Sequence, residues 1–284
     1  MPERGGSIMN SKTWSGTLTY LLLAVTSAIV FLPFYWMLTN SLKDRSQIFM
    51  FPPQWYPHPL VWSNFADLFK RIPFHQYYFN SIYIAVIVTI GTCFFASISG
   101  YAFAKLHFRF KDLIFLMLLS SMMIPTEATV IPLFIWLSKL GMVNTHFPLI
   151  VPQIFGSGGI FGIFLFRQFY ITLPDELMEA AKMDGCNPWQ TFVKVMMPLG
   201  GPMFATLSIY SFLNSWNDFF EPLIFINSDH LYTIPLAMSM FTDQSGTEWH
   251  LLMAAAVLAA LPLLLVFVAA QKRFIEGIAM TGMK

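Results

Sequence analysis

The feature that most constrains this chain is a series of apolar stretches, each close to the length of a membrane-spanning helix. The hydrocarbon core of a bilayer is about 30 Å thick and takes roughly 20 apolar residues as an α-helix. We therefore expect an all-α polytopic membrane protein with six transmembrane helices. The stretches cover about residues 17–38, 81–104, 113–137, 148–169, 201–226 and 251–270.

Composition excludes the other broad classes of protein. Of 284 residues, 56% are hydrophobic and 11% are charged, whereas soluble domains carry about 25% charged residues. Disordered chains combine low hydrophobicity with high charge, which is the opposite composition. The net charge of +1 leaves no positive surplus for a phosphate backbone, so we expect no nucleic-acid partner. The two cysteines are too few for a disulfide scaffold and are expected to behave as small hydrophobes.

Lysine and arginine in the loops predict the orientation of the helices, because cytoplasmic segments carry an excess of these residues. With the N-terminus inside, eleven of the 16 fall inside and five outside. An even number of spans then places both termini in the cytoplasm. We expect a cytoplasmic tail at residues 1–16, a membrane domain at residues 17–270 and a second cytoplasmic tail at residues 271–284.

The inner loop between the fourth and fifth stretches carries the signals of two short helices joined by a turn. Pro174 suits a first helical turn, and the acidic residues after it favour the positive end of the helix dipole. Gly185 can adopt the left-handed conformation that ends many helices. Asn187-Pro188 predicts the N-cap and first residue of a second helix, which Pro198 is expected to end. We expect this helical hairpin within residues 171–198, outside the bilayer.

The hairpin also offers a surface that a partner protein could cover. Ala180 and Ala181 give the first helix low relief, so another helix can pack closely against it. Trp189 and Phe192 are expected to add apolar area on the second helix. These residues favour a docking surface, and an ordinary capped loop is the alternative that spacing alone leaves open.

The spacing of this loop resembles the EAA motif of ABC-transporter permeases. That pattern reads Glu-Ala-Ala, three residues, Gly, nine residues, then Ile-x-Leu-Pro. In this chain the matching segments are residues 179–181, Gly185 and residues 195–198, with Val195 in place of Ile and Met197 in place of Leu. The resemblance implies that the loop docks on a cytoplasmic ATPase. The coupling residues that it implies are Glu179, Ala180, Ala181, Asp184, Gly185 and Pro198.

Further segments resemble the carbohydrate-uptake branch of this family, of the maltose-permease kind. Residues 216–223 (Trp-Asn-Asp-Phe-Phe-Glu-Pro-Leu) resemble its W-N-D-F-x-x-P-L signature, and residues 122–125 and 131–133 resemble its third-span pattern. The resemblance covers about residue 17 to the end of the chain. It implies a permease in the cell inner membrane that imports a sugar, from monosaccharide to oligosaccharide, or a polyol.

The same resemblance implies the partners of this permease. They are a dimer of cytoplasmic ABC ATPases, a second permease subunit that is homologous but different, an extracytoplasmic solute-binding protein and membrane lipid. The chain itself has no G-x-x-x-x-G-K-[ST] phosphate loop, no histidine pair at metal-ligand spacing on one helix and no nucleophile elbow. We therefore expect no enzyme activity, metal or cofactor in this chain, with ATP and Mg²⁺ bound by the partner ATPase.

Polar residues within the apolar stretches are candidates for the transport path, because ionisable groups are costly in a membrane. Glu127 lies in the third stretch. In the fifth stretch, Asn214, Asn217, Asp218 and Glu221 fall at i, i+3, i+4 and i+7, which is one face of a continuous helix. We expect that face to point into the bundle or towards a neighbouring subunit.

Two roles stay open for this polar set. A sugar needs hydroxyl partners and aromatic faces, and Trp216 and Phe220 could supply the aromatic faces. Alternatively, the polar residues hold helices together or pair with the second permease. For Trp216, Asn217 and Asp218 the packing role is favoured, because much of the resembled branch shares this signature whatever it transports.

Two other classes of function compete with an ATP-driven permease. An ion-coupled secondary carrier could use Glu127, Asp218 or Glu221 as its coupling site. Such a carrier needs no ATPase-docking loop, so the hairpin argues against it. A membrane enzyme is disfavoured because no catalytic constellation can be assembled from the sequence.

Overall fold

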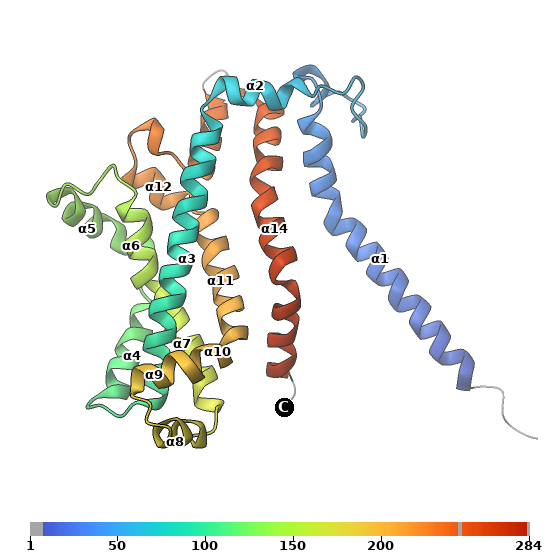
Figure 1. Cartoon of the computed structure of the whole chain (residues 1–284). Helices are drawn as coiled ribbons and strands as arrows, with labels where there is room; N and C mark the ends of the chain where they lie inside the picture. The colour runs from blue at the N-terminus through green and yellow to red at the C-terminus, as the bar shows by residue number, and fades with distance from the viewer. Residues whose placement is uncertain (1–7, 244–245, 283–284) are drawn as a thin grey trace, which may run out of the picture. The chain divides into compact units, whose positions relative to one another are not determined.

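The computed structural model describes residues 8–243 and 246–282, which are mostly α-helical (Figure 1). The expected all-α fold is confirmed. Among the described residues, the strands are the short antiparallel pair β1 (Thr242–Asp243) and β2 (Gly246–Thr247). The α-helices are α1 Ile8–Ser41, α2 Ser63–Arg71, α3 Phe74–Lys105, α4 Lys111–Ser121, α5 Thr126–Lys139, α6 Phe147–Phe155, α7 Ser157–Thr172, α8 Glu176–Met183, α9 Pro188–Thr191, α10 Met197–Leu199, α11 Gly201–Trp216, α12 Phe220–Phe225, α13 Ile234–Met238 and α14 Trp249–Gly282.

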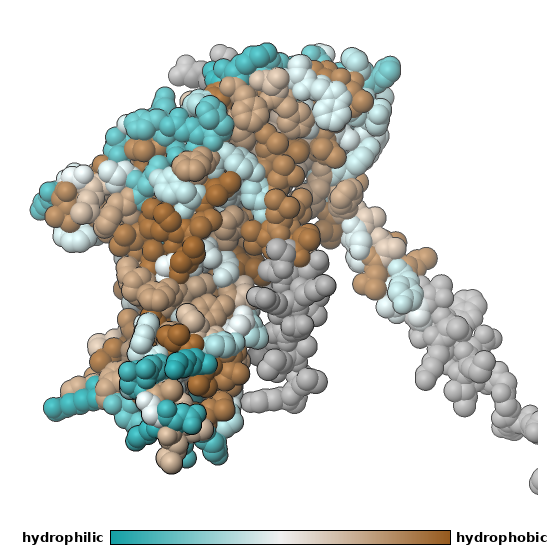
Figure 2. All heavy atoms as spheres, viewed as in Figure 1, coloured by the Kyte–Doolittle hydropathy of each residue, from teal (hydrophilic) through white to brown (hydrophobic). Residues whose placement is uncertain are grey.

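These elements form two compact units. The first contains the described residues up to Ile72 together with Phe241–Leu258, and the second contains Pro73–Met240 and the rest of α14. In the second unit, hydrophobic residues cover the middle of the helices, and hydrophilic residues gather at two opposite ends (Figure 2). This distribution fits helices that cross a membrane with their ends in water.

Helix length and composition give four to six candidate spans. Two pairs of shorter helices are long and apolar enough to cross a membrane only when each pair is taken together. These are α4 with α5, bent by 96°, and residues 188–199 with α11, bent by 77°. The expected six spans are reached when each bent pair counts as one. We expected tails at both ends of the chain. Instead, the helix α1 includes residues 8–16, and the helix α14 includes residues 271–282. The unbroken candidates are Leu18–Ser41, Phe74–Lys105, Phe147–Thr172 and Trp249–Val268.

The third apolar stretch is broken where we expected one interrupted span. Its α4 ends at Ser121, and α5 begins at Thr126 after an extended Pro125. A proline disfavours helical backbone in the residue before it, so Ile124 cannot continue the helix easily. Pro132, in contrast, is accommodated inside α5.

The core of the second unit is built around α3, which packs side by side with α7 and α11 (Figure 1). Glycine makes this packing close. A Cβ on Gly100 of α3 would lie 2.5 Å from the Cβ of Phe166 on α7, and a Cβ on Gly162 would lie 2.7 Å from that of Ala96. Gly162, within the fourth apolar stretch, therefore serves close packing of α7 on its neighbours. The buried side chains of this core are Cys93, Ala96, Tyr101, Phe166, Tyr170, Phe192, Met196 and Leu207.

The first turns of α3 are tied to the segment before α13. Asn80 donates from Nδ2 to the carbonyl oxygens of His230 at 3.0 Å and Tyr232 at 2.9 Å. The Ser81 hydroxyl accepts from the backbone N–H of Ile234 at 2.8 Å. Asn80 and Ser81 are both buried, so these bonds fix residues 230–234 to one end of α3.

In the first unit, a buried lysine organises the loop after α1. Lys43 is 0% exposed, and its Nζ donates to Asn40 Oδ1 at 2.8 Å and to the Gln54 carbonyl at 2.6 Å. The ammonium also lies 4.3 Å from the ring centroid of Trp36. Burial lowers the pKa of Lys43. A buried charge needs such partners, and here they hold residue 54 against the end of α1.

Candidate functional site

The turn of the predicted hairpin forms as its residues indicate. The first helix, α8, ends at Met183, and Gly185 follows with a left-handed φ of +77°. Asn187 Oδ1 accepts from the Gln190 N–H at 2.9 Å, and Gln190 Oε1 accepts from the Asn187 N–H at 2.9 Å. This reciprocal pair is a capping box, with Pro188 as the first residue of α9. The predicted turn and second N-cap are therefore confirmed.

The start of the hairpin differs from the prediction. We expected Pro174 in the first helical turn, but α8 begins at Glu176 and Pro174 precedes it. Asp175 occupies the N-cap position without capping the helix through its side chain. Its carboxylate instead accepts from Lys105, as described below.

The second arm of the hairpin does not end at Pro198 as expected. Its α9 continues as a π-helix over Phe192–Met196, and the Met197 N–H bonds to the Phe192 carbonyl five residues back. A proline inside an α-helix clashes with the carbonyl four residues earlier, and the wider π turn relieves that clash. The arm therefore passes through Pro198, ends at Leu199 and bends by 77° into α11.

The hairpin exposes most of the predicted coupling residues, but not all of them. Ala181 is 5% exposed, so of the two alanines only Ala180 contributes to the low-relief outer surface. The exposed coupling residues are Glu179, Ala180, Asp184, Gly185 and Pro198.

The expected apolar area on the second arm is also smaller than predicted. Trp189 is 55% exposed, but Phe192 is 1% exposed. The Phe192 ring lies 5.5 Å from that of Tyr101 on α3, within the core. Phe192 therefore anchors the arm to the helices, and Trp189 remains for a partner.

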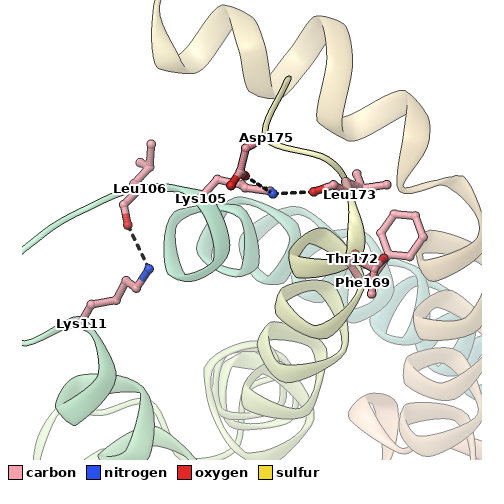
Figure 3. A network of polar contacts seen from close by, with 7 residues as sticks. All are labelled: Lys105, Leu106, Lys111, Phe169, Thr172, Leu173 and Asp175. Carbon is pink, nitrogen blue, oxygen red and sulfur yellow. Dashed lines mark hydrogen bonds and ion pairs between the residues drawn. The ribbon is translucent and has the colours of Figure 1, made fainter. Parts of the chain in front are cut away.

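One lysine that the sequence did not single out fixes the start of the hairpin (Figure 3). Lys105, the last residue of α3, donates from Nζ to the Leu173 carbonyl at 2.6 Å and to Asp175 Oδ1 at 2.5 Å. The Lys105 side chain is 6% exposed and that of Asp175 is 83% exposed. The hydrogen bond and charge of Lys105 hold the pKa of the Asp175 carboxyl below its usual value. In the sequence, the signal that could have identified Lys105 was its position at the end of an apolar stretch.

A second candidate site is a polar cavity in the second unit, with a volume of about 1070 Å³. Its lining residues come from α4, α5, α6, α7, α11 and α12 and from the segments that join them. It brings together six of the seven residues predicted for the path or for helix packing. These are Glu127, Asn214, Asn217, Asp218, Phe220 and Glu221.

The predicted single helical face is wrong, although the residues do meet. The helix α11 ends at Trp216, and α12 starts at Phe220. Pro222 lacks an N–H, and in a continuous helix its ring would clash with the carbonyl of Asp218. The helix therefore breaks after Trp216, and the break, rather than a continuous face, directs the polar residues into the cavity.

Asp218, between α11 and α12, and Glu221, on α12, both accept from one side-chain amide. Gln153 on α6 donates from Nε2 to Asp218 Oδ2 at 3.0 Å and to Glu221 Oε2 at 3.2 Å. Asp218 Oδ1 also accepts from the backbone N–H of Glu221 at 3.2 Å. Sequence reasoning missed Gln153, a polar residue within the fourth apolar stretch.

Trp216, the seventh predicted residue, lies away from the cavity. It is 2% exposed, and its Nε1 donates to the Ala259 carbonyl at 3.2 Å. Its ring stacks on Phe212 at 5.7 Å and meets Tyr78 edge-on at 5.6 Å. These contacts favour the helix-packing role for Trp216.

Comparison with known proteins places this architecture in one family. The family model described as "Binding-protein-dependent transport system inner membrane component" matches residues 93–279. The arabinooligosaccharides transport system permease protein AraQ of Halalkalibacterium halodurans is 35% identical over 80% of this chain and 81% of its own. AraQ of Bacillus subtilis is 32% identical over 94% of each chain. The lactose transport system permease protein LacG of Rhizobium radiobacter is 31% identical over 91% of this chain and 93% of its own.

A solved structure shares the fold. It is a bacterial ABC transporter involved in the import of the acidic polysaccharide alginate, with a TM-score of 0.80 and 20% identity, and the match covers 96% of this chain and 100% of that one. The overall fold of this chain is therefore one that a solved structure already shows. By its sequence, this chain belongs to the family of inner-membrane permease components of binding-protein-dependent transport systems.

Proposed function

We propose that this permease imports a sugar or polyol and is driven by a cytoplasmic ATPase that grips the α8–α9 hairpin. The observation that carries the proposal is the exposed hairpin at one end of the helices, with the EAA spacing and its turn capped by Asn187 and Gly185. Relatives named for arabinooligosaccharide and lactose transport support the substrate class. The family assignment favours this function over an ion-coupled carrier.

The exposed side of the hairpin suits insertion into a groove. Glu179 places a carboxylate there for a basic or polar group of the ATPase, and Ala180 allows close approach. Trp189, 55% exposed, offers apolar area at the rim. Asp184 and Gly185 form the tip, where the left-handed glycine keeps the turn tight. This chain needs no nucleotide site in the proposal, because the ATPase dimer binds ATP and Mg²⁺.

The polar cavity is the proposed part of the translocation path in this chain. Asn214, Asn217 and Glu127 offer hydrogen-bonding groups for sugar hydroxyls, and Phe220, 38% exposed, offers an aromatic face. Ligand sites typically enclose about 300–1,000 Å³, so about 1070 Å³ accommodates a sugar with its water. A homologous second permease would complete the path, and an extracytoplasmic solute-binding protein would deliver the sugar.

The proposed docking of the hairpin on a cytoplasmic ATPase implies an orientation. If the ATPase is cytoplasmic, the ends of α3 and α7 that carry the hairpin face the cytoplasm. The excess of lysine and arginine on the same side agrees with this orientation. With six spans, the proposal also places both termini in the cytoplasm.

Reconstitution tests the proposal. The permease, its partner permease, the ATPase and the binding protein are assembled in proteoliposomes, and ATP-dependent uptake of labelled oligosaccharides is measured. Glu179→Lys should reduce uptake and ATPase co-purification at least about tenfold, equivalent to about 1.4 kcal/mol of docking free energy. Lys139→Glu, an equal charge reversal on an exposed residue at the end of α5, is the control and should transport normally.

Two results would contradict the proposal. One is uptake driven by an ion gradient with the ATPase left out. The other is normal ATP-driven uptake and normal ATPase binding by the Glu179→Lys variant.

A further inference from the structure

Three helix ends meet at one ammonium group (Figure 3). Lys105 is the last residue of α3, Leu173 is the C-cap of α7, and Asp175 is the N-cap of α8. The Lys105 Nζ lies 2.6 Å from the Leu173 carbonyl oxygen and 2.5 Å from Asp175 Oδ1. Only Pro174 separates the two acceptors along the chain. The lysine therefore bridges the whole connection between the core helix α7 and the hairpin.

The other arm of the hairpin is held by the same face of α3. Tyr101 lies one turn before Lys105, at i and i+4, so the two side chains project from one side of the helix. The Tyr101 hydroxyl donates to the Pro188 carbonyl at 3.3 Å, and its ring packs on Phe192. Tyr101 thus contacts the start of α9, while Lys105 contacts the start of α8.

The nature of the two contacts differs. Tyr101 is 3% exposed and belongs to the apolar core, so its contact also serves folding. The Lys105 contact is a charge-assisted pair whose acid is 83% exposed. Short hydrogen bonds between charged groups are directional and stronger than neutral ones. The Lys105 bonds therefore set the angle of the hairpin to α3 more than they contribute to the core.

We propose that Lys105 is a positioning residue that locks the start of the coupling hairpin to α3, so that movement of the hairpin is transmitted to this helix. The inference rests on the proposed function, because it takes the hairpin to be the part moved by the ATPase. Without the lysine, α8 is no longer held to α3 and can swing about the Pro174 connection, while Tyr101 still holds α9. Less of the ATPase closure would then be transmitted to α3.

The test compares Lys105→Met with Lys111→Met in the assembled transporter. Lys111 is the matched control, because it is a lysine of the same region whose Nζ donates to the Leu106 carbonyl at 3.2 Å, apart from Leu173 and Asp175 (Figure 3). The readout is sugar transported per ATP hydrolysed. Lys105→Met should retain the ATPase through purification but transport at least about fivefold less per ATP, whereas Lys111→Met should match the unaltered permease.

Two further variants keep the inference testable if Lys105→Met folds poorly. Lys105→Arg preserves a charged donor and should restore most of the transport per ATP. Asp175→Asn removes the ion pair but leaves the bond to Leu173, and should give an intermediate loss. A purely structural lysine would lower the amount of complex without changing this ratio.

A spin label on the hairpin measures the mobility of the hairpin directly. Cys186 lies in the hairpin turn and is partly exposed, whereas Cys93 is buried, so labelling can be directed to Cys186. Its mobility should increase in Lys105→Met and stay unchanged in Lys111→Met. Normal transport per ATP with unchanged label mobility in Lys105→Met would overturn the inference. That result would leave the proposed function intact, because the unaltered complex would still need its ATPase.

Discussion

Replacing Gly100 by alanine tests how closely α3 and α7 pack. The added Cβ would lie 2.5 Å from Phe166 Cβ, 3.0 Å from the Arg167 nitrogen and 3.1 Å from the Phe166 carbonyl carbon. Carbon atoms in contact prefer about 3.5–4.0 Å, so the helices would have to separate by roughly 1 Å. These neighbours are backbone atoms or are attached to the backbone, and no side-chain rotation relieves the contact.

The size of the effect follows from two opposing contributions. Overpacking a core costs about 1–3 kcal/mol, and alanine in place of glycine inside a helix returns about 0.5–1 kcal/mol. We expect a net loss of about 1–2 kcal/mol. At about 2–4 °C per kcal/mol for a chain of this size, the melting temperature should fall by about 2–8 °C.

The assay is thermal unfolding of the purified permease in detergent, followed by circular dichroism. Gly201→Ala is the matched control, because a Cβ on Gly201 at the start of α11 meets nothing within 4 Å. It should melt at the same temperature as the unaltered chain or slightly above it. If Gly100→Ala melts with the control, the close approach of α3 and α7 does not limit stability and the reasoning is refuted.

Three further changes probe the hairpin and the break after α11. Gly185→Ala should cost about 1–2 kcal/mol because its φ of +77° is left-handed, whereas Gly185→Asn should be milder; hydrogen exchange of the α8 amides measures both. Lys105 lowers the pKa of Asp175 below the ordinary 3.8, so the ion pair contributes stability above pH 3.8 that is lost as pH falls through the lowered pKa. The protease resistance of the hairpin should therefore differ between Asp175→Asn and the unaltered chain at neutral pH and converge in acid. Trp216→Phe loses its bond to Ala259, and should lower stability by about 0.5–1.5 kcal/mol while leaving sugar affinity unchanged; a large loss of affinity would instead place Trp216 in the path.

Local signals in the sequence predicted the hairpin well. A left-handed glycine and an Asn-Pro cap act through bonds to residues one to four positions away, so neighbouring residues are enough to identify them. Gly185 and the Asn187 capping box are accordingly where the sequence indicates. Apolar length likewise predicted the unbroken spans, because it depends on composition alone.

Reasoning failed where distant parts of the chain decide the outcome. Phe192 and Ala181 look like exposed hairpin residues, but both are buried, and Phe192 packs on Tyr101 of α3, which only the fold reveals. The single face in the fifth stretch failed for a local reason that was overlooked. Pro222 stands four residues after Asp218 and disfavours one continuous helix through this segment, so the proline was a local signal for the break between α11 and α12.

The long helix α3 joins the features that sequence reasoning left separate. Lys105 and Tyr101 hold the hairpin at one end, and Asn80 holds residues 230–234 at the other, through bonds of 2.9–3.0 Å. At 1.5 Å per residue, Asn80 lies roughly 37 Å along the helix from Lys105. A tilt of about 5° at Lys105 would then displace Asn80 by roughly 3 Å, which is more than a hydrogen bond tolerates. Residues 230–234 must therefore follow α3 or lose their bonds, so a hairpin locked to α3 moves the opposite end of the unit as well.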